Sequence, residues 1–270
     1  TRSFIGPFLF DFIAINACGS DKQNQTDERP NIIFLLTDDQ RYDALGCMGN
    51  SEIKTPNIDA LAEKGLVFTN HYNTTAICMA SRATIMTGLY EFKSGCNFTH
   101  GPLHEEKFQT SYPMLLREAG YRTGFAGKLG FAVLRPGVKE NSSYHTMDRM
   151  PVEDFDWWRG WPGQGQYQTE KNEYMVEYAE EYPHVTRALG AASIDFINES
   201  LETGKPFCLS VSFKAPHKPV SPDPEYDDVY RGMDFTEPCN YGVEAAEHLP
   251  QQAKMDRQFL RLGKRWNPEE

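Results

Sequence analysis

The sequence predicts an α/β fold in which a central, mostly parallel sheet is flanked by helices. Short apolar runs of strand length alternate along the chain with longer segments whose apolar residues recur at helical spacing. Several of these helical segments end at a glycine, the residue favoured just beyond a helix C-terminus. Acidic side chains directly follow the first apolar run, and parallel sheets carry their chemistry at the carboxyl ends of the strands.

The first expected elements lie between residues 31 and 68. Residues 31–36 read NIIFLL, a short continuous run that predicts a strand buried on both faces. A helix is expected from Thr55 to Gly65, because Pro56 suits the first helical turn and the glycine ends it. Residues 66–68 form a second strand candidate.

The middle of the chain continues the alternation. A short helix is expected over residues 81–86, ending near Gly88. Residues 111–119 predict another helix, capped by Gly120, and residues 121–126 predict a strand. Three residues of the second helix are expected to face inward: Met114, Leu115 and Leu116.

Further helix and strand signals follow residue 183. Residues 184–201 predict a long helix, and residues 207–213 form another apolar strand candidate. The region from 251 to 262 is also helix-like. The apolar stripe of the long helix comprises Val185, Leu189, Ala192, Phe196 and Ile197.

Residues 134–170 differ from the rest because they carry three tryptophans and many glycines without a clear period. We expect a long surface insertion here, and such loops are often functional. Trp157, Trp158 and Trp161 suggest stacking on sugar rings. The alternative is that these rings pack the loop onto the domain.

The composition limits the classes of function. A chain of 270 residues with 40% hydrophobic content can form one sizeable core or most of a larger one. Its net charge of -11 argues against a broad nucleic-acid surface, so no nucleic-acid partner is expected. The cysteines form no C-x-x-C pair, which argues against a disulfide scaffold or zinc ribbon. They are Cys18, Cys47, Cys78, Cys96, Cys208 and Cys239.

Residues 1–29 are expected to be a leader and tether, and residues 30–270 a separate catalytic domain. The apolar stretch 4–15 is too short to span a bilayer. It ends in the run INACGSD, which resembles a bacterial lipoprotein cleavage site with Cys18 as the acylated residue. This predicts a bacterial protein exported to the periplasm, or anchored by lipid at the outer membrane or cell surface. A degraded signal peptide or a ragged terminus is the alternative.

Asp38 and Asp39 directly follow the first predicted strand. Two adjacent carboxylates repel each other unless a cation lies between them, and their hard oxygen atoms suit Ca²⁺ or Mg²⁺. A solvated turn is the alternative for the pair taken alone.

Cys78 and Arg82 form a second candidate group. A cysteine at the start of a helix lies at the positive end of the helix dipole. Arg82 follows four residues later and can share a helix face with Cys78, which places a guanidinium suited to oxyanions beside a reactive centre. A buried thiol near a structural arginine is the alternative.

These residues belong to a set of segments that resembles the sulfatase family. The segment CMASR at 78–82, followed by Thr87-Gly88, is similar to the sulfatase signature. Four further segments resemble the family in the family's order, within residues 30–220: NIIFLLTDDQ at 31–40, TPNIDALA at 55–62, GYRTGFAGK at 120–128 and APHKP at 215–219.

The resemblance implies the fold, the nucleophile and the metal. The fold would be the alkaline-phosphatase-like sandwich of this family. Cys78 would be oxidised by a formylglycine-generating maturase to Cα-formylglycine, whose hydrate supplies the attacking hydroxyl and reaches the metal. Asp38 and Asp39 resemble the first two ligands of that metal, Ca²⁺ or alternatively Mg²⁺.

The resemblance also implies the residues that bind sulfate. Arg82 resembles the residue that holds the formylglycine hydrate, and Lys128 resembles the lysine that binds the sulfate oxygens. His217 resembles the histidine near the leaving-group oxygen. Taken alone, Lys128 could be a solvated strand end and His217 a loop histidine. The implied reaction is hydrolysis of sulfate esters, with a sulfated glycan as the expected substrate and a small aryl or choline sulfate as the alternative.

Two departures from the family pattern stand out. Gly130 occupies the place where the family often carries a histidine that helps the hydrate break down. His71, His100 or His104 could substitute for it, and the residues do not distinguish among them. The chain also carries no later strand that completes the metal site, so we expect an incomplete, C-terminally truncated catalytic domain that could be inactive.

Two other classes of function remain open at this point. One is a phosphonate or phosphate monoester hydrolase of the same superfamily, because these esters share the shape of sulfate esters but differ in charge. The other is a non-catalytic protein, which Gly130 and the missing ligands favour. The substrate, the sulfated position and the oligomeric state are not determined by the sequence.

Overall fold

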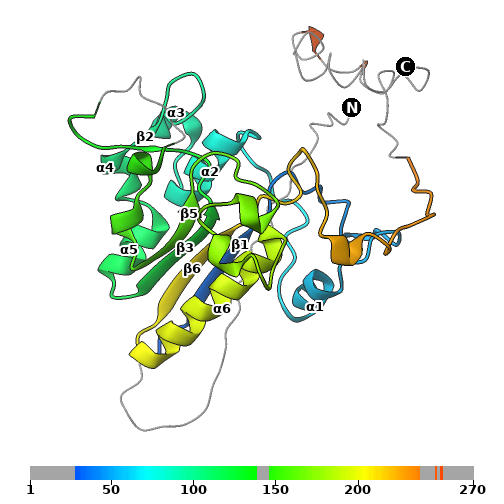
Figure 1. Cartoon of the computed structure of the whole chain (residues 1–270). Coiled ribbons are helices and arrows are strands. Elements are labelled where there is room, and N and C mark those ends of the chain that lie inside the picture. Colours follow the sequence, from blue (N-terminus) through cyan, green and yellow to red (C-terminus); the bar gives the residue numbers. More distant parts are fainter. Residues whose placement is uncertain (1–27, 139–145, 238–246, 248–249, 252–270) are drawn as a thin grey trace. The chain divides into compact units, whose positions relative to one another are not determined.

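The computed structural model describes residues 28–138, 146–237, 247 and 250–251 (Figure 1). The chain divides into two compact units, residues 1–224 and 225–270. The predicted leader with Cys18, and the predicted helix over 251–262 beyond its first residue, lie outside the described residues.

The first unit is built on a parallel sheet of four strands in the order β1-β6-β3-β5 (Figure 1). All three strand pairs are parallel, and Ile32 of β1 lies opposite Cys208 of β6. The predicted strands over 31–36, 121–126 and 207–213 are thereby confirmed. Their bounds, with that of the fourth strand, are β1 (Ile32–Leu36), β3 (Arg122–Lys128), β5 (Trp157–Trp161) and β6 (Phe207–Ser212).

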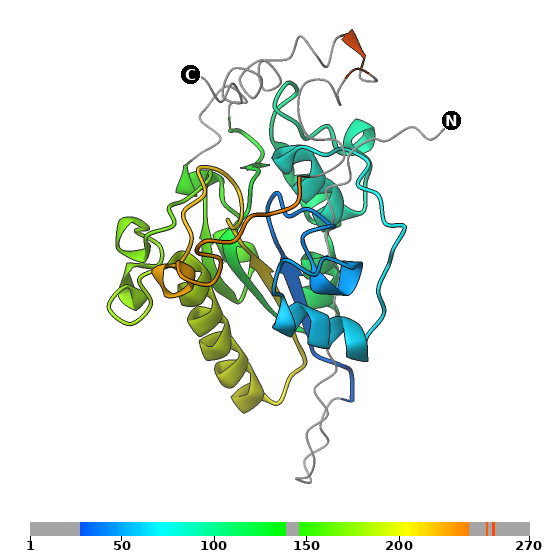
Figure 2. The ribbon, with the colours of Figure 1, turned by 90° about the vertical axis from the view of Figure 1, so that its right-hand side faces the viewer.

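Helices cover both faces of this sheet, which makes a three-layer α/β/α arrangement (Figures 1 and 2). Side chains alternate across β3, so Phe125 joins one core cluster and its neighbour Ala126 joins the other. The Phe125 cluster includes residues of α2 (Cys78–Thr87), α4 (Glu105–Phe108) and α5 (Tyr112–Glu118). The Ala126 cluster packs against α6 (Val185–Thr203). The predicted α/β fold is confirmed.

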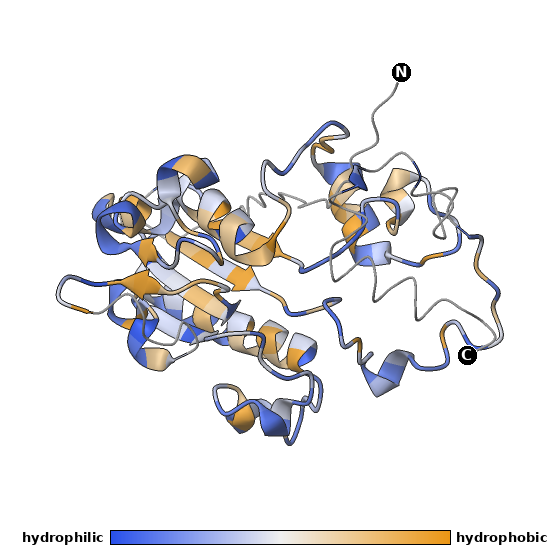
Figure 3. Cartoon of the chain, turned by 90° about the horizontal axis from the view of Figure 1, so that it is seen from above, coloured by the Kyte–Doolittle hydropathy of each residue, from blue (hydrophilic) through white to orange (hydrophobic). Residues whose placement is uncertain are grey.

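The long helix matches its predicted pattern closely. His184 caps the N-terminus of α6 by accepting a hydrogen bond from the Thr186 backbone, and Gly204 ends the helix with a φ of 66°. The stripe facing the sheet is fully buried at Val185, Leu189, Ala192 and Phe196. Figure 3 shows apolar colour on the sheet strands and on the inner side of the helices.

The remaining elements are short. α1 (Pro56–Lys64) and α3 (Glu91–Ser94) are helices, and β2 (Leu103–His104) pairs with β4 (Val133–Leu134) in a second, two-stranded parallel sheet. Six 3₁₀ turns complete the assignment of the described parts: Gly46–Met48, Met147–Arg149, Val152–Asp154, Thr169–Lys171, Val176–Tyr178 and Pro224–Tyr226.

The tryptophan-rich segment was predicted as surface insertion, and this was wrong for its centre. Trp157–Trp161 is the strand β5, which lies next to β3 in the sheet. Trp161 is completely buried, and Trp158 stacks on Phe125 with ring centroids 4.9 Å apart. The rings therefore fill the core, because a large aromatic side chain suits a pleated surface even where glycines hide the period. Trp161 therefore has no face left for sugar stacking, whereas Trp157 and Trp158 are partly buried and pack against the core.

Two smaller predictions were also wrong. Residues 66–68 are not a strand: no strand in the described part of the chain pairs with them, and Leu66 is 82% exposed. Leu115 of α5 was expected to face inward but is 53% exposed, because the burial of α5 falls on Pro113 and Met114.

None of the helices in the described residues is long and apolar enough to cross a bilayer. In the second unit, the described residues include an ion pair between Arg231 and Asp228 and a ring contact between Tyr230 and Phe235.

Candidate active site

Polar side chains gather at the carboxyl edge of the sheet. Asp38 and Asp39 follow β1, Lys128 ends β3, and His217 lies in the loop after β6. The backbone N–H of Asp38 donates to the carbonyl of Ala215, which joins the loops that follow β1 and β6. Because parallel strands end at one edge, residues far apart in sequence meet there, as the sequence predicted for these side chains.

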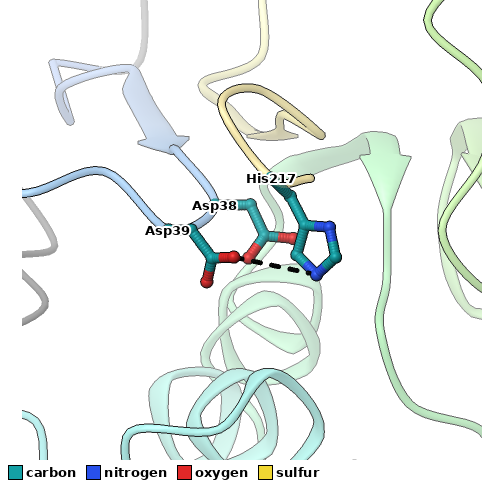
Figure 4. Close-up of side chains that lie close together, drawn as sticks. All are labelled: Asp38, Asp39 and His217. Atoms are coloured by element: carbon teal, nitrogen blue, oxygen red, sulfur yellow. Dashed lines mark ion pairs between the residues drawn. The ribbon is translucent and has the colours of Figure 1, made fainter. Parts of the chain in front are cut away.

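Asp38, Asp39 and His217 form a compact group (Figure 4). One ligand atom from each residue lies within 4.8 Å of the others, and His217 Nε2 is 3.8 Å from Asp39 Oδ2. Asp38 is buried, whereas the side chain of Asp39 is 45% exposed. The Tyr167 hydroxyl donates to the His217 carbonyl at 2.6 Å, which fixes the loop that carries the imidazole.

The two carboxylates fit a hard divalent cation. Ca²⁺ binds oxygen at roughly 2.3–2.6 Å, so two ligands of one ion lie at most about 5 Å apart. Asp38 and Asp39 meet that spacing. The nitrogen of His217 is a less typical ligand for such an ion, and Ca²⁺ takes roughly six to eight oxygens. The pair would therefore supply only part of a calcium site.

Arg82 lies fully buried under this edge. Its guanidinium donates to the Lys128 carbonyl at 2.7 Å and to the hydroxyl of Ser212, and it pairs with Asp38 Oδ2 at 3.3 Å. Burial lowers the pKa of Arg82, and the negative charges of Asp38 and Cys78 oppose that shift. The bonds to two strand ends hold the guanidinium in one place.

Lys128 is buried beside the same carboxylate. Its Nζ donates to Asp38 Oδ2 at 2.6 Å and to Gln164 Oε1 at 2.6 Å. Burial, and next the nearby Arg82, lower the pKa of Lys128, while Asp38 raises it. Asp38 thus balances two buried cations that would otherwise repel each other.

Cys78 is the first residue of α2 and is partly buried. An electrostatic interaction with Cys78 raises the pKa of both Arg82 and Lys128, which places the thiol near the two cations. Cys78 is not part of the group formed by Asp38, Asp39 and His217. The structure thus brings the six predicted site residues to one edge of the sheet, while their catalytic and metal-binding roles stay predictions.

Lys214 and Tyr167 also lie at the site, although neither was predicted from the sequence. Lys214 is buried and follows β6, with its Nζ 4.9 Å from the centre of the Tyr167 ring. Burial and then Lys128 lower the pKa of Lys214. The pKa of Tyr167 rises to about 12, first through burial and then through Asp38 and Asp39. The position of Lys214, three residues before His217 at a strand end, was a usable signal.

Gln164 was also missed, for a different reason. It lies in the glycine-rich turn after β5, and its side-chain oxygen reaches Lys128. This turn enters the site only because β5 belongs to the sheet. Because the tryptophan segment was predicted to be a surface insertion, Gln164 was not expected to lie at the sheet edge.

Gly130 leaves no room for the side chain that the family often carries there. A Cβ built on Gly130 would lie 2.3 Å from Arg82 Cδ, and the residue has a φ of 81°. A histidine at this position would displace Arg82. Of the three substitutes considered, His100 and His104 line a separate pocket with Thr74 and Thr75.

Residues 30–257 match the sulfatase family. An N-acetylglucosamine-6-O-sulfatase of Bacteroides thetaiotaomicron is 31% identical over 84% of this chain and 38% of its own length. An arylsulfatase of Clostridium perfringens is 31% identical over 78% of this chain and 48% of its own length. A structure solved in complex with its substrate D-glucosamine-2-N,6-O-disulfate is 30% identical, with a TM-score of 0.60, over 79% of this chain and 40% of that chain.

The chain thus spans less than half the length of these relatives. Similarity in sequence and in structure agrees with the α/β sheet described above and confirms the expected alkaline-phosphatase-like fold. The matched region covers most of the chain and contains every residue of the candidate site. The chain belongs to the sulfatase family.

Proposed function

We propose that this chain carries part of the active site of a sulfatase that hydrolyses sulfate esters with a nucleophile made from Cys78. The observation that carries the proposal is the meeting of Arg82 and Lys128 on Asp38 Oδ2 beside Cys78. Two fixed, buried cations next to a nucleophile suit an anionic ester, because water screens them little.

Sulfate esters resist attack because their oxygens repel a nucleophile. Arg82 and Lys128 would spread the negative charge that grows on these oxygens, and Lys214 adds a third buried cation close by. All three cationic side chains are already held at the site by the sheet or by α2, so none has to move there when the substrate binds. A divalent cation on Asp38 and Asp39 would add further positive charge.

Conversion of Cys78 to formylglycine by a maturase would give a hydrate with two hydroxyl groups. One hydroxyl attacks sulfur, the sulfur–oxygen bond to the substrate breaks, and the leaving alcohol takes a proton. The second hydroxyl then loses its proton, the aldehyde carbonyl re-forms and sulfate leaves. An unmodified cysteine has no second hydroxyl, so it could not release the product this way.

His217 is the proposed proton donor to the leaving oxygen. The imidazole lies beside Asp39 at the open side of the group, and its loop is held by Tyr167. Histidine is a common general acid in catalysis, and this geometry leaves the imidazole beside the place where the leaving oxygen would lie.

The proposed substrate is a sulfated glycan. A relative named N-acetylglucosamine-6-O-sulfatase and a structure in complex with D-glucosamine-2-N,6-O-disulfate support this class. A phosphate or phosphonate ester is the alternative within the superfamily. The comparisons favour a sulfate ester as the substrate. A side-by-side assay of 4-nitrophenyl sulfate and 4-nitrophenyl phosphate distinguishes the two classes of ester.

Mass spectrometry of the Cys78 peptide is the direct test of the nucleophile. Co-expression with a maturase should yield formylglycine, and turnover of 4-nitrophenyl sulfate should then depend on it. Cys78→Ala should abolish sulfate release without unfolding the protein, since the residue is only partly buried. Full activity in that variant would refute the assignment.

Export with a lipid anchor at Cys18 is a separate proposal, supported by the run INACGSD after a short apolar stretch. Labelled palmitate should be incorporated by the wild-type protein in a bacterial host and lost in Cys18→Ala.

A further inference from the structure

We propose that a pocket beside α3 binds the sugar residues that adjoin the sulfated sugar, so that this protein prefers sulfated oligosaccharides to sulfated monosaccharides. The pocket, called the α3 pocket below, is lined by Thr75, Tyr90, Phe92, Asn97, His100 and Lys107 among others. The inference rests on the proposed function, because it assigns a neighbouring subsite to the same reaction.

The α3 pocket is lined by segments that flank, on both sides in the sequence, the helix that begins with Cys78. Thr75 lies three residues before the first residue of α2, and Tyr90 lies three residues after the last. Thr75 therefore connects the pocket to the turn that leads into the nucleophile, which places the pocket near the reacting group. Its volume is about 730 Å³, within the roughly 300–1,000 Å³ of ordinary ligand sites.

The polar wall of the pocket is held in one arrangement by Asn97. Its Oδ1 accepts the backbone N–H groups of Thr99 at 2.8 Å and His100 at 2.6 Å, which identifies the other end of the amide as the donor. That donor, Nδ2, lies 2.9 Å from His100 Nδ1 and also bonds to Glu91. Nδ1 therefore acts as the acceptor, so the neutral imidazole carries its proton on Nε2. His100 presents a fixed N–H donor.

The other walls supply a cation and aromatic faces. Lys107 donates to the Ser94 carbonyl at 3.2 Å, which holds its ammonium at the pocket. Tyr90 is 64% exposed and Phe92 is 97% exposed, although both line the pocket. Two aromatic rings left open beside fixed polar groups match the requirements of a sugar, which has an apolar face and a rim of hydroxyl groups.

The position of the pocket determines which sugar it takes. The sulfated residue would lie at Cys78, where Arg82 and Lys128 hold the sulfate. The next residues of the same glycan would then extend along α2 to His100, Tyr90 and Phe92. The tryptophans of β5 are less suited to this role, because Trp161 is buried and Trp157 and Trp158 pack against the core.

The test measures binding in the absence of turnover. Cys78→Ala protein, in the natural full-length form, is titrated by calorimetry with glucosamine-6-O-sulfate and with a tetrasaccharide that ends in the same sulfated sugar. We expect the tetrasaccharide to bind at least about tenfold more tightly, an increment typical of a few added contacts. His100→Ala and the double variant Tyr90→Ala/Phe92→Ala should each remove most of that gain and leave monosaccharide binding within about twofold.

Tyr226→Ala, at an exposed aromatic residue that does not line the pocket, is the matched control and should bind both probes as the parent does. Equal affinity for the two probes, or pocket variants that weaken both alike at unchanged melting temperature, would overturn the inference. A wild-type protein that matures but releases no sulfate would instead count against the proposed function, because binding in Cys78→Ala does not depend on turnover.

Discussion

Gly130 and Arg82 show how a single missing side chain shapes this site. The structure uses the space at Gly130 for the aliphatic part of Arg82, whose guanidinium then reaches Lys128, Ser212 and Asp38. The glycine at position 130 departs from the family pattern and could indicate an inactive protein. In this chain it is also required for the packing of Arg82.

Gly130→Ala should lower turnover of 4-nitrophenyl sulfate by about tenfold or more, since a lost contact to a charged group costs roughly 1.5–3 kcal/mol. Gly130→His should be worse rather than better, because the larger side chain displaces Arg82 further. Gly137→Ala is a matched control: Gly137 has the same φ of 81°, but nothing lies within 4 Å of its Cβ position. Equal losses in the two alanine variants would mean that backbone strain alone explains the effect.

Gln164 is an exposed residue whose side-chain oxygen accepts a hydrogen bond from the buried Lys128. Gln164→Leu removes an acceptor 2.6 Å from the lysine Nζ and leaves Asp38 as the main partner. We expect a rise of several-fold in KM for 4-nitrophenyl sulfate with a smaller change in kcat, because the Nζ of Lys128 would no longer be held in position to bind the sulfate. Gln166→Leu, in the same turn, should change neither constant. A fall in kcat alone would contradict this positioning role.

At the scale of elements, β6 is buried along its whole length and carries a thiol in the core. Burial raises the pKa of Cys208 to about 12, and burial followed by Glu91 raises that of Cys96 to about 12. The folded state thus keeps protons that the unfolded chain releases near pH 9. The stabilisation is complete below pH 9 and is lost as the pH rises to about 12.

The free energy of unfolding should therefore fall steeply between pH 9 and 12, by up to about 4 kcal/mol for each thiol on the basis of 1.36 kcal/mol per pH unit. Cys208→Ala should show a smaller slope over this window, as measured by urea unfolding at a series of pH values. Cys47→Ala, which removes an exposed thiol, should keep the wild-type slope. Parallel profiles for all three proteins would show that Cys208 ionises freely in the fold.

At the scale of the whole molecule, the sheet edge brings together the loops after β1 and β6, where Asp38, Asp39 and His217 form the proposed cation site. A ligand that binds only the folded state stabilises it by RT ln(1 + [L]/Kd), or about 2.7 kcal/mol at a hundred times Kd. Ca²⁺ should accordingly raise the melting temperature, and a chelator should reverse the shift.

Asp39→Asn should remove most of the stabilisation by Ca²⁺ and leave the metal-free melting temperature close to that of the wild type, since Asp39 is half exposed. Asp38→Asn should also destabilise the metal-free protein, because it leaves Lys128 and Arg82 buried without their shared partner. Asp43→Asn, at an exposed residue paired with Arg41, is the control and should respond to Ca²⁺ normally. An unchanged Ca²⁺ response in Asp39→Asn would place the ion elsewhere.

The sequence by itself determined the elements whose signal is local. The apolar run at 31–36 and the stripe and glycine end of α6 follow from the order of residues within one segment. The helix expected over residues 81–86 is also present, although it begins earlier, at Cys78. The motifs likewise predicted Asp38, Arg82, Lys128 and His217 as site residues; the structure brings them to one edge of the sheet, and their roles stay predictions.

Only the tertiary structure decided which segments meet. Trp157–Trp161 forms a strand because it pairs with β3 and because its rings pack against the core. Residues 66–68 lie outside the sheet, since no described strand pairs with them. The sharing of Asp38 by two cations, the reach of Gln164 to Lys128 and the conflict between Gly130 and any larger residue are also distances across the fold. Such contacts join residues 36 to 90 positions apart in the sequence, so no local pattern of residues could encode them.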